Sequence, residues 1–571
     1  MPRPVKPDRP VIAEPVVEPI QGTTIVVIHA GSSVLRIGRT TDHYPHSIPH
    51  VIARKITSND LFSKYSGKNL FIRKGGQHAE SDDKKAHGLR SAKTLIQAMR
   101  ISGGHRKPRT TPAEVASYNS QVRPAAVDND GSVSWTDVSA MPNFFIGEQV
   151  LSLPSSAPYS IRWPMAHGQL NIHSSVGGSV TSIAADLQTL WGSAIETYLE
   201  IPVKDLNYYR AVLLIPDIFE RAHVKVLVDV LLNRLKFSCV IVGQESVCGA
   251  FGSGLPSACV VDVGAEKTSI CCVEDGISLP STRVTLNYGG NDITRCFYWL
   301  LKMANFPYRS IDTEDQFDAQ LLQELKETFC HLSMEIPSGH VHEFQVVRPN
   351  ENILVYKLRL GDEPLLAPTS MFVPDLFGIV DEPLIKTFPE ILECDPEDLM
   401  DHRYLLEKRD VDTKKAKGEN ENESQEFISL SHTAPIEHAK LKALRLDGMP
   451  LDEAIMYSIE QCSNQETKRK MYGTVLLIGG GMNFKGTDEF LLKRLQSQLS
   501  PHYHFMKEQM EVITRPKEND PRTAGWKGGT VLSILDSSQE LWISRKEWNQ
   551  YGVRILRERC AFQWSTNMDK Q

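Results

Sequence analysis

Three features that would identify whole classes of protein are missing from this sequence. No apolar run approaches the roughly 18 residues of a membrane-spanning helix, so we expect no membrane association. The 10 cysteines contain no CxxC pair, and several lie within apolar runs, which favours reduced, buried thiols in a nuclear or cytosolic protein. The 63 Lys and Arg residues are outnumbered by 70 Asp and Glu residues, so any nucleic-acid contact must come from a local basic patch.

The remaining composition is that of an ordinary globular protein. The chain has 571 residues, 41% of them hydrophobic, which is enough for roughly two to four domains. Four segments interrupt the regular apolar patterning. We predict a disordered Pro-rich tail at 1–21, a locally basic, irregular insertion at about 57–140, a charged low-complexity insertion at about 380–448 and a short tail at 563–571.

Two stretches of the same shape carry the first functional signal. "IVVIHAGSSVLRIG" (25–38) and "CVVDVGAEKTSICCV" (259–273) both consist of a strand, a small polar turn and a strand. Alternating strand and helix patterns follow each of them, which favours a mainly parallel, helix-covered sheet. The sequence therefore predicts an α/β protein of two pseudo-equivalent halves, 22–257 and 258–562.

The turns of these two stretches suit an anionic ligand. Small residues let backbone N–H groups approach an anion, and two such turns facing each other could hold the phosphates of a nucleotide from both sides. For either turn taken alone, an ordinary hairpin is the better interpretation. Because the two turns occupy matching positions in the two halves, together they are a more specific indication of ligand binding than either turn alone.

Three further motifs each allow a functional and a structural interpretation. The glycines of "IGGGMNF" (478–484) separate an apolar strand from a helix, where a flat or anionic ligand can approach and Phe484 can stack on a base; the alternative is a tight turn. Lys326 and Glu327 could contact the ribose and base edge of a nucleotide, and the alternative is an ordinary surface ion pair. Gln244 follows an apolar strand, where its amide could orient a water molecule. The alternative is a polar side chain at a strand end whose hydrogen bonds are satisfied within the fold.

Taken in order, these motifs resemble the actin fold, which actins share with sugar kinases and heat-shock ATPases. The stretch "RWPMAHGQL" places His167 at the position of the methylated histidine of actin, and "WKGGTVLSILDSSQELWISRKEWNQYG" (526–552) matches the C-terminal segment of actin. Shorter motifs, among them "IPHVIAR", "QESVC" and "LKETFCHL", are most similar to actin-related proteins of a nuclear chromatin remodeller. The resemblance covers 23–56, 144–380 and 449–562.

The resemblance implies a nucleotide cleft between the two halves, with ATP as the ligand. It also implies that the segment 526–562 packs back on the first half. The nucleotide-binding residues would be Gly31, Ser32, Ser33, Arg36, Asp262, Val263, Gly264, Ala265, Lys326, Glu327, Gly480, Gly481, Phe484 and Arg522.

Departures from the actin pattern affect the catalytic metal and the attacking water. His29 stands where actins have a carboxylate that holds Mg²⁺ and its waters, and histidine is a poor partner for this hard, oxygen-preferring ion. Ala265 replaces a second carboxylate, and Ser269 replaces the histidine that helps to activate water. Asp262 remains as a weak, indirect metal contact and Gln244 as a residual water-orienting residue, so Mg²⁺ binding stays open. We therefore expect ATP binding without appreciable turnover.

The expected function is that of a nuclear, non-enzymatic scaffold subunit of a chromatin-remodelling complex, with roles in transcription regulation and in DNA repair and recombination after DNA damage. The resemblance implies as partners a helix of the remodeller's motor subunit, actin and another actin-related protein, with histones and linker DNA reached through the complex. Basic residues at Arg54-Lys55, Lys84-Lys85 and 106–109 are candidates for DNA contact. The alternatives are an active ATPase or small-molecule kinase of the same superfamily, and a filament-forming actin.

Overall fold

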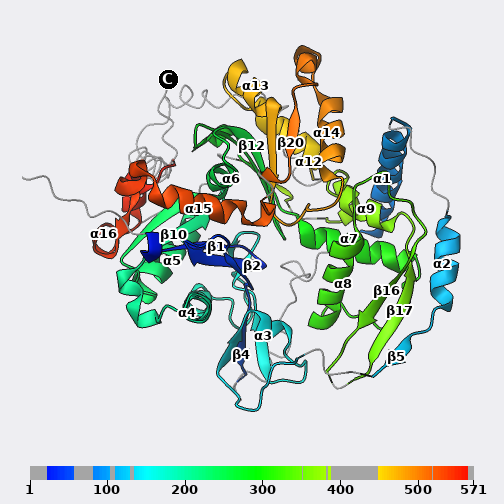
Figure 1. Cartoon of the computed structure of the whole chain (residues 1–571), viewed down its shortest axis with the longest axis horizontal. Helices are drawn as coiled ribbons and strands as arrows, with labels where there is room; N and C mark the ends of the chain where they lie inside the picture. The colour runs from blue at the N-terminus through cyan, green and yellow to red at the C-terminus, as the bar shows by residue number, and fades with distance from the viewer. Residues whose placement is uncertain are drawn as a thin grey trace, which may run out of the picture.

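Two mixed sheets covered by helices form the centre of the protein (Figure 1). The computed structural model describes residues 22–56, 81–102, 110–128, 134–349, 351–380, 383–387, 448–516 and 519–562. The expected tails at 1–21 and 563–571, and most of the expected insertion at 380–448, lie outside these residues. Within the described ranges, no helix combines the length and apolar character needed to cross a membrane.

The first sheet has the strand order β21-β11-β10-β1-β2-β3. Its central strands β1, β10 and β11 are parallel, and β2 returns antiparallel to β1. All of β1 is buried, as expected for a parallel strand with helices on both faces. The strands are β1 (Ile25–Ala30), β2 (Val34–Arg39), β3 (His46–Pro49), β10 (Arg210–Ile215), β11 (Cys239–Gln244) and β21 (Ile543–Ser544).

The second sheet repeats this arrangement in the order β18-β15-β13-β12-β19-β20, with β14 paired to β13. β12 pairs antiparallel with β13 and parallel with β19, as β1 does with β2 and β10. The pseudo-equivalence expected from the two hairpin stretches is thus visible in the topology. The strands are β12 (Ala258–Val263), β13 (Thr268–Glu274), β14 (Ile277–Ser278), β15 (Val284–Leu286), β18 (Ile385–Thr387), β19 (Thr474–Ile478) and β20 (Glu511–Ile513).

Two helices that cross near the middle of the molecule connect the sheets (Figure 1). α6 (Glu245–Ser253) follows β11 and packs on β12, whereas α15 (Ala524–Ile534) packs on both β1 and α6. β21 then returns the C-terminal segment to the edge of the first sheet, beside β11. The other helices are α4 (Val180–Tyr198), α5 (Arg221–Asp229), α7 (Gly290–Met303), α8 (Gln316–Phe329), α9 (Glu363–Thr369), α12 (Leu451–Glu460), α13 (Gln465–Gly473), α14 (Thr487–Gln498), α16 (Arg545–Tyr551) and α17 (Ile555–Arg559).

A small sheet extends each half outward. In the first half it has the order β6-β4-β7 and is accompanied by the short helix α3 (Glu148–Leu151), and in the second half it has the order β16-β17-β5. The strand β5 comes from the chain segment expected as the first insertion, although it joins the second half. The strands are β4 (Ile52–Lys55), β5 (Ala125–Val127), β6 (Phe144–Ile146), β7 (Tyr159–Arg162), β16 (Val341–Val346) and β17 (Ile353–Arg359).

The insertion at 57–140 is more regular than the sequence suggested. Its described part contains α1 (Asp82–Ser102) and α2 (Pro112–Gln121), in addition to β5. Leu89, Ala92 and Ile96 lie on one face of α1 and are buried in the core of the second half. The expectation of an irregular segment was wrong because three apolar residues suffice when a helix packs on a surface that the rest of the fold already provides.

This packing also affects the basic residues proposed for DNA contact. Arg54 Nε donates to Asp186 Oδ1 at 2.8 Å, and Lys85 is buried. These two residues are therefore engaged within the fold, whereas Lys55 is exposed. The third candidate, 106–109, lies outside the described residues.

Candidate nucleotide-binding site

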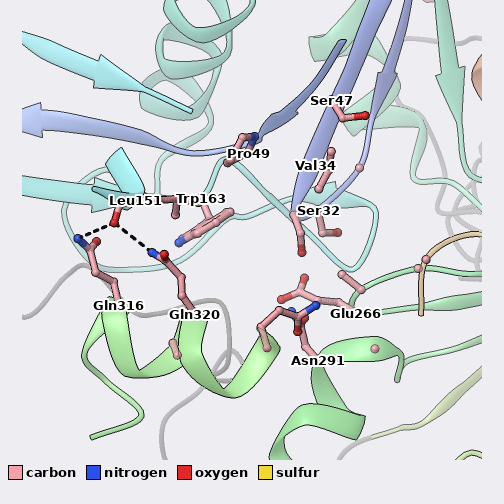
Figure 2. Close-up of a pocket in the computed structure, with 18 of the residues that line it drawn as sticks. Ser32, Val34, Ser47, Pro49, Leu151, Trp163, Glu266, Asn291, Gln316 and Gln320 are labelled. Carbon is pink, nitrogen blue, oxygen red and sulfur yellow. Dashed lines mark hydrogen bonds between the residues drawn. The ribbon is translucent and has the colours of Figure 1, made fainter. Parts of the chain in front are cut away.

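A cavity of about 1370 Å³ separates the two halves. Its wall is formed by the turn after β1, the turn after β12, α8 and the glycine loop after β19. Figure 2 shows Ser32 of the first half facing Glu266 and Asn291 of the second. All of the expected nucleotide-binding residues except Val263 line the cavity: Gly31, Ser32, Ser33, Arg36, Asp262, Gly264, Ala265, Lys326, Glu327, Gly480, Gly481, Phe484 and Arg522.

The turn after β1 and the strand β2 that follows it present polar atoms that have no partner in the described part of the chain. Ser33 Oγ and Arg36 Nε are both buried and unpaired. Burial lowers the pKa of Arg36, although the nearby Asp262 carboxylate opposes this effect. Unpaired buried groups of this kind are costly unless a ligand supplies acceptors. Ser32 differs from its neighbour, because its hydroxyl accepts the N–H of Gly168 at 2.9 Å.

The turn after β12 is fixed by backbone hydrogen bonds. The Gly264 N–H donates to the Lys267 carbonyl at 2.9 Å, and the Gly264 carbonyl accepts from Gly290, the first residue of α7, at 3.0 Å. Val263 is buried in β12, and its carbonyl accepts the N–H of Gly481 at 2.8 Å. Val263 therefore supports the glycine loop rather than lining the cavity.

Two glycines of this loop are required by close backbone approach. Gly479 has a φ of +87°, and a Cβ there would lie 2.3 Å from the Val263 carbonyl oxygen. A Cβ on Gly481 would lie 2.5 Å from the Gly264 carbonyl oxygen. The loop thus lies directly against the second turn.

Lys326 and Glu327 lie on α8 at another part of the wall. Lys326 Nζ donates to the Gly290 carbonyl at 3.1 Å and to Gln323 Oε1 at 2.8 Å, and Gln323 Nε2 donates to Glu327 Oε1. Burial lowers the pKa of Lys326 to about 8, although the Glu327 carboxylate opposes it. This position combines an ammonium donor with a carboxylate acceptor, which suits the hydroxyl groups of a ribose.

Arg522 and Phe484 offer flat surfaces beside the glycine loop. Asp520 holds the Arg522 guanidinium through three contacts, Nε to Oδ1 at 3.0 Å, Nε to Oδ2 at 2.9 Å and Nη2 to Oδ2 at 2.7 Å. A Cβ on Gly480 would stand 3.6 Å from Arg522 Cγ, so the arginine stem lies over the loop. Phe484 packs against the core of the second half. Aromatic and guanidinium planes of this kind can stack on a purine.

Two charged residues that the sequence interpretation did not single out lie at the phosphate end. Lys267 Nζ pairs with Glu245 Oε2 and donates to Ser269 Oγ at 3.2 Å. The other Glu245 oxygen lies 3.4 Å from His29 Nε2. The sequence contained one indication that Glu245 reaches the cavity. Glu245 directly follows Gln244 at the end of an apolar strand, where polar side chains can enter a cleft.

This cluster drives the pKa values of two carboxyl groups apart. Burial would raise the pKa of Glu245, but the Lys267 ammonium and the His29 ring outweigh it and lower the pKa to about 2. Burial, and next the Glu245 carboxylate, raise the pKa of Asp262. Glu245 is therefore ionised at neutral pH with both oxygens engaged, which makes it a weak general base.

The surroundings of Asp262 do not fit the weak Mg²⁺ contact that the sequence suggested. Mg²⁺ prefers oxygen ligands in octahedral geometry, whereas Asp262 interacts electrostatically with three basic side chains, Lys267, His29 and Arg36. Across the described ranges, no group of three or more His, Cys, Asp or Glu residues could hold a metal ion.

Gln244 does not fit its expected role either. It is 1% exposed and is not among the residues that line the cavity. Its Nε2 lies 3.4 Å from the Asp217 carbonyl oxygen, and its Oε1 lies 3.5 Å from Arg283 Nη2. Because β11 ends here, the amide points into the protein while Glu245, the next residue, reaches the cavity. Gln244 therefore cannot orient water beside the phosphates in this arrangement.

His167 joins the two halves near the phosphate turns. The backbone N–H of His167 donates to Glu266 Oε2 at 2.9 Å, and the ring Nδ1 lies 2.7 Å from the Glu266 carbonyl oxygen. The neighbouring Gly168 contacts Ser32, so one short segment touches both turns.

Comparisons with known proteins agree with this geometry. The protein-family model for actin matches residues 20–336 and 402–561. This chain belongs to the actin family. Within the family, it is 43% identical to Actin-related protein 8 of Bos taurus over 95% of this chain and 93% of the relative, and 42% identical to that of Homo sapiens with the same coverage. Actin-related protein 8 of Aedes aegypti is 35% identical over 96% of this chain and 99% of the relative.

A solved structure of the family supports the same fold. "Human actin-related protein Arp8 in its ATP-bound state" superposes with a TM-score of 0.82 at 42% sequence identity, covering 97% of this chain and 100% of that chain. These matches confirm the actin fold and the similarity to actin-related protein 8 that the motifs indicated.

Proposed function

We propose that this protein binds ATP in the cleft and serves as a nuclear scaffold subunit of a chromatin-remodelling complex, without appreciable ATP turnover. The observation that carries ATP binding is a pair of buried atoms, Ser33 Oγ in the first turn and Arg36 Nε in β2, that have no partner among the described residues. A polyphosphate supplies acceptors for both. The solved relative in its ATP-bound state supports the same ligand for this chain.

The cavity has a place for each part of the nucleotide. The phosphates would lie between the turns after β1 and β12, where Arg36 provides a fixed positive charge. The ribose would lie near Lys326 and Glu327, and the base between the planes of Phe484 and Arg522. This assignment uses the cavity-lining residues that the two halves bring together.

The same residues explain why turnover should be low. Hydrolysis requires a positioned water, a group that accepts its proton and charge stabilisation at the leaving phosphate. Ala265 and Ser269 offer no such base, Gln244 is withdrawn, and the lowered pKa of Glu245 keeps it from accepting a proton. A single lost group of this kind commonly costs about 10²–10⁴-fold in rate.

One observation favours the alternative of an active ATPase or small-molecule kinase. Burial and Glu245 raise the pKa of Asp262, which brings this carboxylate nearer to the range of a general base. If Asp262 acts in this way, Asp262→Asn should abolish a measurable hydrolysis or transfer reaction. Our proposal instead expects no such reaction in the unmodified protein.

Nucleotide binding and turnover can be tested on the purified full-length chain. We expect calorimetry to show ATP binding, Arg36→Met to weaken it, and Arg309→Met, at an exposed arginine away from the cavity, to leave it unchanged. Single-turnover hydrolysis at the rate of conventional actin would contradict the proposed lack of activity. Absence of ATP binding would contradict the proposed ligand.

The scaffold role rests on similarity to the actin-related protein 8 sequences. We propose that the chain binds a helix of the remodeller's motor subunit together with actin and another actin-related protein, and contacts histones and linker DNA through that complex. Its roles in transcription regulation, DNA repair and recombination would follow from this assembly. Native mass spectrometry of the tagged protein from nuclear extract should recover these subunits, and a cytoplasmic, partner-free protein would contradict the proposal.

A further inference from the structure

The Lys267 side chain reaches the phosphate end of the cavity along a path shaped by a glycine. A Cβ on Gly168 would stand 2.5 Å from Lys267 Cε, so the aliphatic stem passes where only glycine leaves room. The Lys267 side chain is 12% exposed, which places its ammonium inside the cavity wall rather than in solvent.

Both halves of the protein hold this ammonium in place. Glu245, at the start of α6, pairs with it from the first half, and Ser269 of β13 accepts a hydrogen bond from it in the second half. An ammonium has three N–H donors. Two are used by these contacts, and within the described residues the third has no partner and is available to a ligand in the cavity.

The charges around Lys267 disfavour a divalent cation. Glu245 uses one oxygen for Lys267 and the other for His29. Asp262 interacts with Lys267, His29 and Arg36. A divalent cation beside Asp262 would therefore meet the repulsion of Lys267 and Arg36, and phosphate oxygens and water would have to supply its ligands.

We propose that the Lys267 ammonium is a built-in substitute for the divalent cation, so that the cleft binds ATP in its metal-free form. Together with Arg36 it neutralises phosphate charge, while Glu245 and Ser269 fix its position. This inference rests on the proposed ATP binding and adds the ionic form of the ligand. The cleft would select free ATP over the Mg²⁺ complex.

The test compares ATP affinity in excess EDTA with that in excess MgCl₂, by calorimetry on the full-length protein. We expect the unmodified protein to bind at least as tightly in EDTA as in MgCl₂. Lys267→Met should weaken binding in EDTA by about 10–100-fold, the loss expected for one charged hydrogen bond. The control Lys546→Met, at an exposed residue of α16 outside the cavity, should not change it.

A second variant separates the cation role from simple support of the fold. Lys267→Met leaves the buried Glu245 unpaired, so the double variant Lys267→Met/Glu245→Gln removes both charges, and thermal unfolding checks that each variant is folded. We expect MgCl₂ to restore part of the affinity of Lys267→Met, because the loss of this ammonium lets Glu245 and Asp262 attract a cation more strongly. We expect less restoration in the double variant. Equal losses in EDTA and MgCl₂ would show that Lys267 only supports the fold.

The remaining outcomes separate this inference from the proposed function. Binding that occurs only in MgCl₂ would overturn the inference and leave ATP binding intact. Binding in neither condition would overturn both.

Discussion

Gly528 of α15 lies against the backbone of α6 so closely that a Cβ on it would stand 1.6 Å from the Cys248 carbonyl oxygen. The reverse contact is equally close, because a Cβ on Gly252 of α6 would stand 2.0 Å from the Ala524 carbonyl oxygen. Glycines on both helices therefore permit the crossing that sets β1 and β12 opposite each other. The spacing of the two phosphate turns depends on this crossing.

Gly528→Ala should destabilise the protein strongly. The added methyl group overlaps backbone atoms that cannot rotate away, and overpacking of this kind costs about 1–3 kcal/mol or more. Urea denaturation of the purified protein measures the change. Gly473→Ala is the control, since the nearest atom to its Cβ is the Met506 methyl at 4.0 Å. Equal stability of the two variants would show that the helices can move apart.

The stability of the nucleotide-free protein should depend on pH through Lys326. Burial lowers its pKa from the ordinary value of 10.5 to about 8. Between these values the unfolded chain holds more protons at this residue than the folded chain, so its contribution to stability rises with pH.

The measurement is the free energy of unfolding of the unmodified protein minus that of Lys326→Met, from about pH 8 to about pH 10. This difference should increase, whereas the corresponding difference for the exposed Lys546→Met should stay constant. A flat or decreasing difference for Lys326 would mean that its ammonium is not destabilised by burial.

The rate of nucleotide release should be controlled by two glutamines at the mouth of the cleft. Gln316 Nε2 donates to the Leu153 carbonyl at 2.6 Å, and Gln320 Nε2 donates to the Leu151 carbonyl at 3.1 Å. Figure 2 shows both glutamines of α8 pointing toward Leu151. These bonds join α8 of the second half to the outer part of the first half.

Gln316→Ala/Gln320→Ala should increase ATP dissociation several-fold, because opening of the halves no longer breaks these bonds. Stopped-flow displacement of a fluorescent ATP analogue measures the rate. Gln496→Ala removes a similar bond, to the Lys507 carbonyl at 2.8 Å, away from the cavity. If the double variant and this control release nucleotide equally fast, the cleft does not open at α8.

The actin fold and its two turns were predictable because their signals are local. A buried strand, a turn of small residues and a returning strand are adjacent in sequence, and the repetition at 25–38 and 259–273 shows that the halves are pseudo-equivalent. The glycine loop was predictable for the same reason. Its glycines lie directly between β19 and α14.

The ion pair of Lys267 and Glu245 was not predictable in this way. The two residues belong to different halves, and only the packing of α6 on β12 and β13 brings them together. The predicted water-orienting role of Gln244 was wrong for a related reason, since a strand end alone does not reveal which of two successive side chains enters the cleft. For α1, the missing information was the surface of the second half that covers its short apolar face.

We expect no filaments under conditions that polymerise actin. A head-to-tail filament needs two complementary surfaces, and the insertion adds α1, α2 and β5 to the outer face of the second half (Figure 1). High-speed sedimentation and electron microscopy provide the measurement, with conventional actin as the positive control. Salt-dependent pelleting accompanied by visible filaments would contradict this expectation.

Any DNA contact should depend on the basic residues at 106–109 more than on those at 54 and 85. Arg54 pairs with Asp186 and Lys85 is buried, so neither charge is free for phosphate. Deleting all of 57–140 would be a poor test, because it would also remove α1 from the core of the second half. Substitution of the three basic residues at 106–109 avoids this damage.

Arg106→Ala/Lys107→Ala/Arg109→Ala should therefore weaken binding of the assembled module to linker DNA while subunit assembly persists. Each lost phosphate contact reduces the slope of log affinity against log salt by about 0.9, so the slope should decrease by up to about 2.7. The control Lys485→Ala/Lys493→Ala/Lys507→Ala removes the same charge from exposed positions of the second half. A selective loss in the first variant assigns the contact to 106–109. Equal losses in both would indicate only a general charge effect, and unchanged affinity in both would exclude this segment from the DNA contact.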